Sequence, residues 1–292
     1  MFDPKSMAIL MNGQPFSYEQ LETRLSKLID QLACYQDHTV LGLASDKAWL
    51  SYLFVLACSQ LNQTLFLLNP KLPAWRLQQL VDQSGCKFVI NDSQLVLSTE
   101  TTIVDVKHFF SIQQSGEISS RNICNSSGIQ LIVATSGTSG EPKGVMLSTA
   151  AIAASARAVH ASLNLLENDC WLNCLPLYHI AGLSIIYRCH YARASMILHE
   201  HFHAEQVWKD LVNYCVTHIS LVPVMLSRLL DVSHDASPPA NLRVVLIGGA
   251  ALSPSLARRA QNAGWPIVIS YGMTETGSLC AYDDSPDAGM EI

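Results

Sequence analysis

One stretch of the chain, residues 135–144, combines the residue types that bind phosphate groups. It reads Thr-Ser-Gly-Thr-Ser-Gly-Glu-Pro-Lys-Gly. Glycines allow backbone N–H groups to approach a polyanion closely, and concave runs of such groups bind phosphate. Hydroxyl groups add further donors, and the ammonium of a lysine adds a charge that suits phosphate oxygens. The stretch therefore predicts a phosphate-binding loop, whose candidate contacts are Thr135, Ser136, Gly137, Thr138, Ser139, Gly140 and Lys143.

The spacing within this loop excludes two better-known motifs. A Walker-type loop requires glycine, four residues and then Gly-Lys-Ser/Thr, whereas here Pro142 stands five residues after Gly137 and Gly144 follows the lysine. A nucleophile elbow, Gly-x-Ser-x-Gly, requires a second glycine where this chain has Glu141. A flexible Gly/Ser surface loop is the alternative that composition leaves open.

Apolar runs flank the loop and predict a strand on each side of it. Leu131–Ala134 precede the loop and Val145–Leu147 follow it. Ser148 or Thr149 is then placed to cap a helix through the alanine-rich segment 150–159. The loop is thus expected to join two strands rather than a strand and a helix.

The rest of the chain alternates between helical and extended patterns. After Ser17, leucines and one isoleucine recur at helical spacing as far as Leu32, and Ser253-Pro254 is a typical helix start. The predicted strands are 40–44, 64–68, 87–91, 129–134, 170–174, 195–198, 220–222, 243–247 and 267–270. The predicted helices are 47–61, 73–84, 149–163, 182–191, 204–215 and 223–231. Such alternation predicts an α/β fold of mostly parallel sheets covered by helices.

A polar segment divides this alternation into two parts. Residues 111–127 are rich in Ser, Gln and Asn and are the best candidate for a linker. A chain of 292 residues is long enough for two lobes. We therefore predict an N-terminal α/β subdomain over 1–127 and a second over 128–292, which carries the phosphate-binding loop.

Composition indicates an intracellular globular protein. Hydrophobic residues make up 49% of the chain and charged residues 14%, and the net charge of −6 gives no reason to expect nucleic acid or an anionic membrane as a partner. The nine cysteines form no CxxC pair and are expected to be reduced, mostly buried thiols. The most apolar stretch, Trp49–Leu68, is interrupted by polar residues, and no signal peptide is recognisable. We expect no membrane span and a cytoplasmic location.

Three candidate site segments directly follow predicted strands. Thr135 follows strand 129–134, Gly248 follows 243–247, and Tyr271 follows 267–270. Ligands of open α/β sheets bind beyond the carboxyl ends of the strands. We therefore expect these segments to converge on one site, and the family resemblance given next implies that this site binds a nucleotide.

Four segments together resemble the core motifs of the adenylate-forming superfamily, which contains acyl- and aryl-CoA ligases, luciferases and peptide-synthetase adenylation domains. They occur in the family's order: the loop 135–144, Leu-Pro-Leu-Tyr-His-Ile-Ala-Gly at 175–182, Ile-Gly-Gly-Ala-Ala-Leu at 247–252, and Ser-Tyr-Gly-Met-Thr-Glu-Thr-Gly at 270–277. The similarity extends to Gly-Gln-Pro-Phe-Ser-Tyr at 13–18. It implies the fold of the large N-terminal domain of these enzymes.

The resemblance also implies a role for each motif in binding ATP and Mg²⁺. The Gly-Gly pair approaches adenine, Tyr271 stacks on the base, and Thr274 contacts the α-phosphate. Glu275 holds Mg²⁺, which favours oxygen ligands and is shared with the phosphates. His179 lines the acyl site near the substrate carboxylate. Beyond the loop, the implied nucleotide contacts are Gly248, Gly249, Ala250, Tyr271, Gly272, Met273 and Thr274. The implied catalytic residues are His179, Lys143, Thr274 and Glu275. His179 and Gly272 are also implied to face the acid.

A second group of histidines offers a different site. His199, His201 and His203 are spaced two apart and lie on one face if the backbone is extended. A zinc site needs about three or four convergent ligands, and no Cys or acidic pattern completes one here. We expect a polar turn after strand 195–198.

Within the superfamily, residues 220–277 most resemble the o-succinylbenzoate–CoA ligases of menaquinone biosynthesis. This implies ATP-dependent adenylation of a carboxylate and its transfer to coenzyme A. The acid has a second carboxylate, for which Arg228 and then Arg188 are the candidate partners; a surface position on a helix is the alternative for both. Another aryl- or acyl-CoA ligase, an amino-acid adenylation domain and a non-catalytic nucleotide-binding remnant remain open, as does a homodimer.

The last of the family's motifs found in this sequence lies close to its final residue. Ile292 stands 15 residues after Gly277. We therefore expect the family's ribose-binding Asp, its hinge and its C-terminal domain with the catalytic lysine to be absent, and the chain alone to be inactive or nearly so.

Overall fold

The computed structural model of the chain describes residues 7–11, 13–35, 40–92, 95–98, 100–111, 128–135 and 143–283. The linker predicted over 111–127 and loop residues 136–142 fall almost wholly outside the described residues. The chain forms two compact units. We name them by their sheets: the six-strand unit comprises Glu19–Ile152 with Leu177–His179, and the eight-strand unit comprises Met1–Tyr18, Ala153–Pro176 and Ile180–Ile292.

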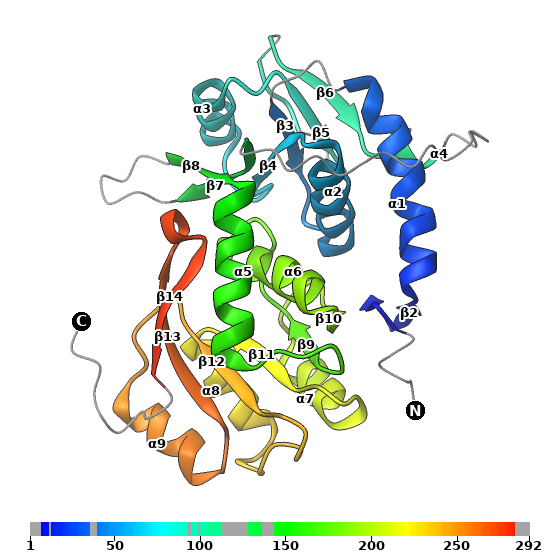
Figure 1. Cartoon of the computed structure of the whole chain (residues 1–292). Coiled ribbons are helices and arrows are strands. Elements are labelled where there is room, and N and C mark those ends of the chain that lie inside the picture. Colours follow the sequence, from blue (N-terminus) through cyan, green and yellow to red (C-terminus); the bar gives the residue numbers. More distant parts are fainter. Residues whose placement is uncertain are drawn as a thin grey trace. The chain divides into compact units, whose positions relative to one another are not determined.

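The six-strand unit contains a sheet of order β6-β5-β3-β4-β7-β8 (Figure 1). All neighbouring strands are parallel except the edge pair β7 and β8. The strands are β3 (Val40–Ala44), β4 (Thr64–Leu68), β5 (Phe88–Asn91), β6 (Thr102–Asp105), β7 (Ile129–Thr135) and β8 (Lys143–Ser148). The helices are α1 (Tyr18–Leu32), η1 (Ala33–Tyr35), α2 (Ala48–Leu61), α3 (Ala74–Ser84) and α4 (His108–Ser111).

Helices α1 and α2 differ in how much of their surface is buried, as their sequences require. In α1 only the leucine stripe at Leu21, Leu25, Leu28 and Leu32 is buried. In α2 every residue from Leu50 to Cys58 is buried, because this segment is apolar on nearly all sides. Helix α3 ends at Gly85, whose φ of 66° places it in the left-handed conformation typical of a helix C-terminus.

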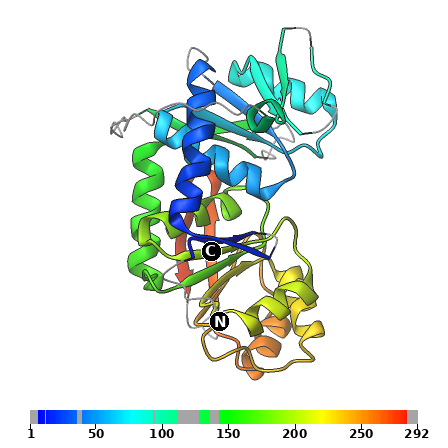
Figure 2. The same cartoon turned by 90° about the vertical axis from the view of Figure 1, so that its right-hand side faces the viewer.

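The eight-strand unit contains a sheet of order β14-β13-β12-β11-β9-β10-β1-β2 (Figure 2). Its interior pairs are parallel, and the edge pairs β1–β2 and β13–β14 are antiparallel. The strands are β1 (Ile9–Met11), β2 (Gln14–Phe16), β9 (Cys170–Asn173), β10 (Ser195–Leu198), β11 (His218–Leu221), β12 (Val244–Ile247), β13 (Ile267–Met273) and β14 (Ser278–Asp283). The helices are α6 (Ile180–Ala192), α7 (Ala204–Asn213), α8 (Pro223–Val232), α9 (Pro254–Asn262) and the short η2 (Thr274–Thr276), and α5 (Thr149–Leu163) belongs mostly to this unit.

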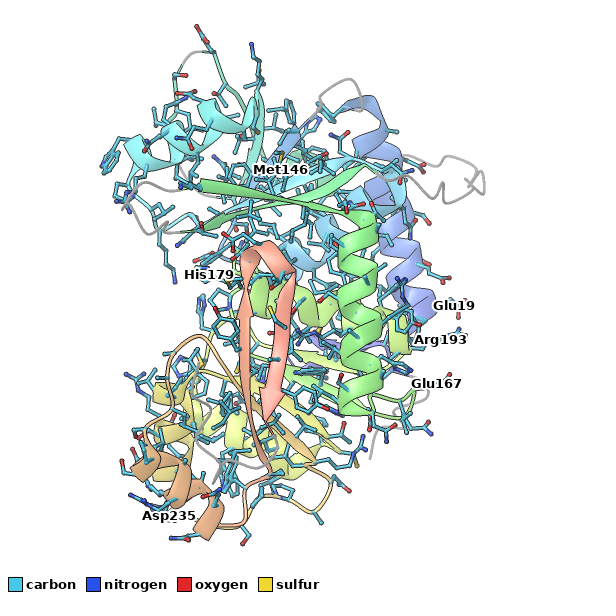
Figure 3. The ribbon with its side chains drawn as sticks, turned by 60° about the vertical axis from the view of Figure 1, so that its left-hand side comes forward. Glu19, Met146, Glu167, His179, Arg193 and Asp235 are labelled. Carbon is cyan, nitrogen blue, oxygen red and sulfur yellow. The ribbon has the colours of Figure 1, made fainter. Side chains whose placement is uncertain are left out.

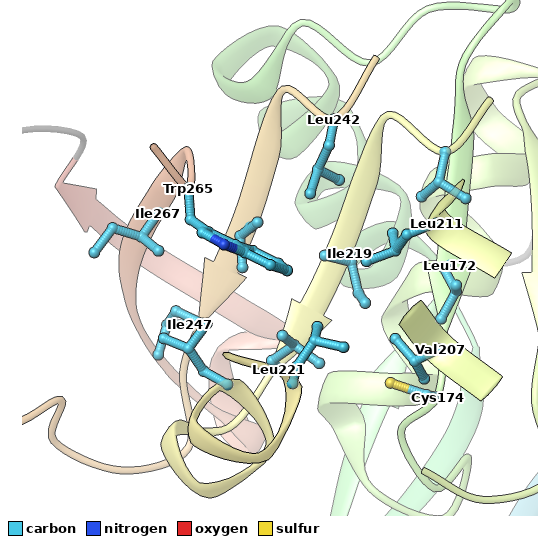
Figure 4. Close-up of a cluster of buried hydrophobic side chains, with 14 of the residues drawn as sticks. Leu172, Cys174, Val207, Leu211, Ile219, Leu221, Leu242, Ile247, Trp265 and Ile267 are labelled. Carbon is cyan, nitrogen blue, oxygen red and sulfur yellow. The ribbon is translucent and has the colours of Figure 1, made fainter. Parts of the chain in front are cut away.

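The strands of the eight-strand unit bury both faces. Leu172, Ile219 and Leu221 pack in one cluster with side chains from α7, α8 and α9 (Figure 4). Successive side chains of a strand point to opposite faces, so Trp171 and His218 lie on the other face, where their rings stack 5.1 Å apart. This second face is the one on which α6 places Arg188, over the ring of Trp171. The sheet is therefore a two-sided core with helices on each face.

The observed elements confirm the predicted α/β architecture. Strands β3, β4 and β10 have the predicted limits, and Ser253 caps α9 by accepting from the N–H of Leu256. Strand β13 continues three residues beyond the predicted end at Ser270, because Tyr271, Gly272 and Met273 pair with β14, which the sequence did not predict. Helix α7 stops at Asn213 instead of Cys215, since Tyr214 is already extended.

The strands on both sides of residues 112–127 lie in one sheet, because β4 pairs with β7. The compact units divide at Ile152 and Ala153, later than the limits 1–127 and 128–292 that we predict for the domains.

The described cysteines are free, as predicted from their spacing. Cys58, Cys86, Cys170, Cys174 and Cys189 are buried, and desolvation raises the pKa of Cys86 to about 11. These thiols are therefore protonated at neutral pH. Within the described ranges, the helices are too short or too polar to cross a lipid bilayer.

Candidate nucleotide site

The predicted phosphate-binding loop connects two paired strands. In the antiparallel pair β7–β8, Thr135 lies opposite Lys143. The loop between them, with Ser136, Gly137, Thr138, Ser139 and Gly140, lies outside the described residues. Strand β8 leads into α5, where Ser148 accepts a hydrogen bond from the N–H of Ala151 at 3.1 Å. The prediction that the loop joins two strands is confirmed, and of the two predicted caps, Ser148 and Thr149, it is Ser148 that caps the next helix.

Both described ends of the loop are accessible. Lys143 is exposed and Thr135 is half-buried, and Met146 farther along β8 is exposed as well (Figure 3). No ion pair joins Lys143 to a carboxylate of the described residues. The lysine is thus available to an external anion.

In the eight-strand unit, two of the predicted motifs lie side by side at the carboxyl ends of β12 and β13. Ile247 pairs with Ile269, and the hydroxyl of Ser270 donates to the carbonyl of Ile247 at 2.9 Å. That hydroxyl also fills the space beside Gly248, where a Cβ would lie only 2.7 Å from it. A larger residue at position 248 would therefore displace this hydroxyl from its hydrogen bond with Ile247. Gly249 and Ala250 follow and are exposed.

The motif at 270–277 forms the end of β13 and a tight turn. The pairing of β13 with β14 shifts between Tyr271 and Gly272, and a Cβ on Gly272 would overlap the carbonyl oxygen of Ser278. Thr274–Thr276 then form η2. Tyr271, Gly272, Met273 and Glu275 are exposed, and Thr274 is half-buried. The turn therefore presents a hydroxyl, a carboxylate and an aromatic ring at the edge where Gly248 lies.

The motif at 175–182 begins at the carboxyl end of β9. There the buried Asn173 accepts from the N–H of Leu175 at 3.2 Å and donates to the carbonyl of Gly182 at 2.9 Å. His179 precedes α6 and is exposed (Figure 3), with its ring 4.9 Å from that of Tyr178. Desolvation lowers the pKa of His179 below its usual value. At neutral pH the imidazole is therefore mostly neutral, which suits a positioning role.

Two residues that fix these segments were not predicted from the sequence. Asn173 joins the two ends of the motif at 175–182. The sequence feature that could have pointed to it is a polar amide at the end of the apolar strand Cys170–Asn173. Ser155 on α5 donates to the carbonyl of Gly277 at 2.9 Å and so fixes the turn after η2. The alanine-rich sequence around Ser155 carries no sign of this contact.

The two candidate arginines have opposite surroundings. Arg228, on α8, is exposed, whereas Arg188, on α6, is only 1% exposed. Arg188 donates from Nη2 to the hydroxyl of Ser278 at 3.0 Å. The surface position considered for both arginines from the sequence is confirmed for Arg228 and wrong for Arg188.

The histidine cluster lies beside a separate cavity of about 660 Å³ at the carboxyl ends of β1 and β10. His199 and Asp210 pair there, with 2.8 Å between Nε2 and Oδ2. Among the described residues, no group of three or more His, Cys, Asp and Glu side chains converges to hold a metal ion. The segment from His199 to His203 forms the turn between β10 and α7, as predicted.

Within the eight-strand unit, Gly248 lies next to the segment 270–277. Within the six-strand unit, Thr135 lies opposite Lys143. A single nucleotide site made from both units stays a prediction of the sequence.

Comparison with known proteins agrees with these motifs. The chain is 32% identical over 295 residues to a protein from Bacillus subtilis named 2-succinylbenzoate–CoA ligase, an alignment that covers 99% of this chain and 60% of that protein. The fold of this chain is similar to that of o-succinylbenzoate CoA synthetase from Bacillus subtilis. The TM-score is 0.89 for the complex with ATP and magnesium ion and 0.88 for the complex with the acyl-adenylate intermediate, each at 28% identity over 99% of this chain.

This chain spans about three fifths of the length of those relatives, with 60% and 61% of the solved chains covered. The similarity thus extends over nearly all of this chain and over the N-terminal part of the solved synthetase. The sequence profile of the family described as AMP-binding enzyme matches residues 3–291. The chain therefore belongs to the family of AMP-binding enzymes.

Proposed function

We propose that the protein to which this chain belongs is an ATP-dependent acid–CoA ligase that activates o-succinylbenzoate for menaquinone biosynthesis. The observation that carries the proposal is the carboxyl edge of β12 and β13, where Gly248, Tyr271 and the Thr274–Thr276 turn lie together. The similarity to proteins named for this activity supports the choice of acid.

In the proposed reaction, a carboxylate oxygen of the acid attacks the α-phosphorus of ATP. The bond from that phosphorus to the bridging oxygen breaks, and pyrophosphate leaves with its electron pair. The sulfur of coenzyme A, having lost its proton, then attacks the acyl carbon, and AMP leaves. The protein's part in the first step is to align the two reactants and to stabilise charge on the phosphates.

Each candidate residue has a part in that step. Lys143 and the loop hydroxyls, including Thr138, hold the phosphate oxygens, and Thr274 donates to the α-phosphate. Gly248, Gly249 and Ala250 let the backbone approach adenine, on which Tyr271 stacks. His179 and Gly272 border the acid, where a neutral imidazole positions the carboxylate without transferring a proton.

The residues at the turn fit a magnesium ion. Glu275 carries an exposed carboxylate and follows Thr274 in the turn, and magnesium prefers such oxygen ligands together with water and substrate phosphates. A magnesium ion held by Glu275 and the phosphates would neutralise part of the charge on the pyrophosphate. Coenzyme A is the co-substrate of the second step.

Replacing Glu275 with glutamine tests this assignment. The change keeps the size of the side chain but removes its charge, so the concentration of Mg²⁺ that gives half-maximal activity is expected to rise about tenfold. The measurement is ATP–pyrophosphate exchange against Mg²⁺ concentration, with Glu167→Gln on an exposed loop as the control. An unchanged requirement for Mg²⁺ in Glu275→Gln would show that this carboxylate does not hold the ion.

The second carboxylate of the acid needs a partner, because an unpaired charge is costly in an apolar pocket. We propose Arg228, which is exposed and belongs to the helix most similar to the family. Arg188 is the second candidate, but its side chain is buried and contacts Ser278, which favours a structural role. Arg228→Ala should raise the KM for o-succinylbenzoate about tenfold and leave the KM for ATP unchanged, whereas Arg258→Ala on α9 should change neither. Equal KM values for the acid with and without Arg228 would contradict the role.

The proposed activity is tested by ATP–pyrophosphate exchange with a panel of acids, using the full-length protein. We expect exchange with o-succinylbenzoate and little with benzoate or medium-chain fatty acids. Preference for one of these monocarboxylates would favour another aryl- or acyl-CoA ligase, and preference for an amino acid would favour an adenylation domain. No exchange with any acid would favour a non-catalytic nucleotide-binding protein.

The surroundings of the protein form part of the proposal. The free, buried thiols support a reducing compartment such as the cytoplasm. A homodimer stays a prediction, which sedimentation of the purified protein can check.

A further inference from the structure

A buried arginine lies beside the turn that carries Thr274 and Glu275. The guanidinium of Arg188 lies over the ring of Trp171, with 5.3 Å between Cζ and the ring centroid. No carboxylate of the described residues forms an ion pair with it. Desolvation lowers its pKa to about 10, so the group is still protonated at neutral pH.

This arginine is an unfavourable choice if it serves only to fill space. Removing a cation from water is costly unless an anion or several hydrogen bonds compensate, and an apolar side chain of similar volume often stabilises a core more. The buried carboxylate of Asp169 pairs with Arg243 at 2.6 Å, and no described residue accepts a hydrogen bond from Nε of Arg188. The contact with Trp171 offsets part of the cost. Among the described residues, the one hydrogen bond that the structure shows for this guanidinium is donated by Nη2.

That hydrogen bond ends on a residue with a strained backbone. Nη2 of Arg188 donates to Oγ of Ser278 at 3.0 Å. The φ of Ser278 is 107°, which residues other than glycine rarely adopt and which persists only when surrounding contacts enforce it. The carbonyl of Ser278 accepts from Oγ1 of Thr276 at 3.1 Å, inside the turn. The same carbonyl occupies the space beside Gly272.

A second helix holds the neighbouring residue. Ser155 on α5 donates to the carbonyl of Gly277 at 2.9 Å, and farther along β14 the hydroxyl of Tyr282 donates to the carbonyl of Ser162 at 3.4 Å. The hairpin β13–β14 thus runs along α5 (Figure 1) and contacts α6 through Arg188. Of these contacts, only the one from Arg188 acts on the side chain of the strained residue.

We propose that Arg188 is a positioning residue for magnesium-bound ATP: by holding Ser278 in its strained conformation, it fixes the turn that presents Thr274 and Glu275. The proposal rests on the nucleotide role of that turn given above. It assigns to Arg188 a function that acts through the backbone, without contact to the substrate.

Hydrogen exchange tests the mechanical part of the proposal directly on this chain. Arg188→Met removes the charge and keeps a long buried side chain, and Ser278→Ala removes only the accepting hydroxyl. Each should raise the exchange rates of the amides at 274–279 about tenfold or more, while the amides of β11 and β12 stay protected. Arg258→Met, an exposed arginine on α9, is the control and should change none of these rates. If Arg188→Met does not fold, Ser278→Ala alone decides the outcome.

Kinetics of the full-length protein test the consequence for ATP. Arg188→Met and Ser278→Ala should each raise the KM for Mg·ATP in pyrophosphate exchange about tenfold, with the KM for the acid unchanged. The double variant should be no weaker than either single variant, because both changes remove the same hydrogen bond. Arg188→Lys should recover part of the loss, since it restores one charged donor.

Two results would overturn the proposal. Unchanged exchange at 274–279 in both single variants would show that Arg188 does not hold the turn. A rise in the KM for the acid alone would show that Arg188 meets the acid instead of positioning ATP. Absence of pyrophosphate exchange in the unmodified protein would contradict the proposed function, whereas the hydrogen-exchange result would still decide the role of Arg188.

Discussion

Gly272→Ala is expected to lower ATP–pyrophosphate exchange roughly a hundredfold or more, because displacement of reacting groups by about 1 Å has effects of that size. A Cβ at position 272 would overlap the carbonyl oxygen of Ser278 and approach the N atom of Leu279 to 3.1 Å. Both are backbone atoms of β14, so no side-chain rotation relieves the overlap. The hairpin must open, and the turn with Thr274 and Glu275 moves with it.

Gly272→Ala is also expected to lower the stability of the protein. Overpacking typically destabilises a protein by about 1–3 kcal/mol, which a thermal unfolding curve would show as a lowered Tm. Gly85→Ala is a matched control: nothing lies within 4 Å of a Cβ at that position, although its φ of 66° disfavours alanine. That variant should lose about 1 kcal/mol of stability and keep its activity. Full exchange activity in Gly272→Ala would show that the turn does not need this close approach.

Lys143→Ala is expected to lower ATP–pyrophosphate exchange roughly ten- to a hundredfold. A hydrogen bond to a charged group contributes about 1.5–3 kcal/mol, and that difference in transition-state stabilisation gives the stated range. Thr138→Ala should act in the same direction and less strongly, since it removes a neutral donor. Lys143→Arg keeps the charge and should retain part of the activity.

The structure makes Lys143→Ala a clean test. The residue is exposed at the start of β8, so its loss should leave the Tm unchanged. Lys107→Ala is the control, because Lys107 is also exposed and its only described ion partner is Asp105 at 4.0 Å. A Lys143→Ala protein as active as the unmodified one would mean that the loop at 135–144 does not bind the phosphates.

The buried parallel strands could be predicted from the sequence because each is a short apolar run with clear ends. Val40–Ala44 and Thr64–Leu68 have the predicted limits for this reason. Strand β14 was not predicted: it lies at a sheet edge where Cys280, Ala281 and Tyr282 are exposed, and its short run Leu-Cys-Ala-Tyr contains no β-branched residue. Strand β2 was missed on similar grounds: it contains Pro15 and is only half-buried.

In the candidate site, too, features that depend on a local pattern were predicted, and contacts between residues far apart in the sequence were not. Motif spacing predicted that Gly248 and Tyr271 would meet, because carboxyl ends of neighbouring parallel strands share one edge. The sequence did not predict that Arg188 is buried or that Ser155 binds Gly277, which stands 122 residues away. Arginine is usually exposed, and a contact between distant residues leaves no local pattern. The candidate ligand-binding residues were thus easier to predict from the sequence than the residues that hold their segments in place.

The most direct test of the account is to detect the acyl-adenylate itself. The full-length protein would be incubated with ATP, Mg²⁺ and o-succinylbenzoate without coenzyme A, and the quenched mixture analysed by mass spectrometry. The proposed function predicts o-succinylbenzoyl-AMP and an equal amount of pyrophosphate, both lowered by Lys143→Ala, and loss of the adenylate when coenzyme A is added. Absence of this adenylate, with ATP intact or with adenylate formed only from another acid, would contradict the account.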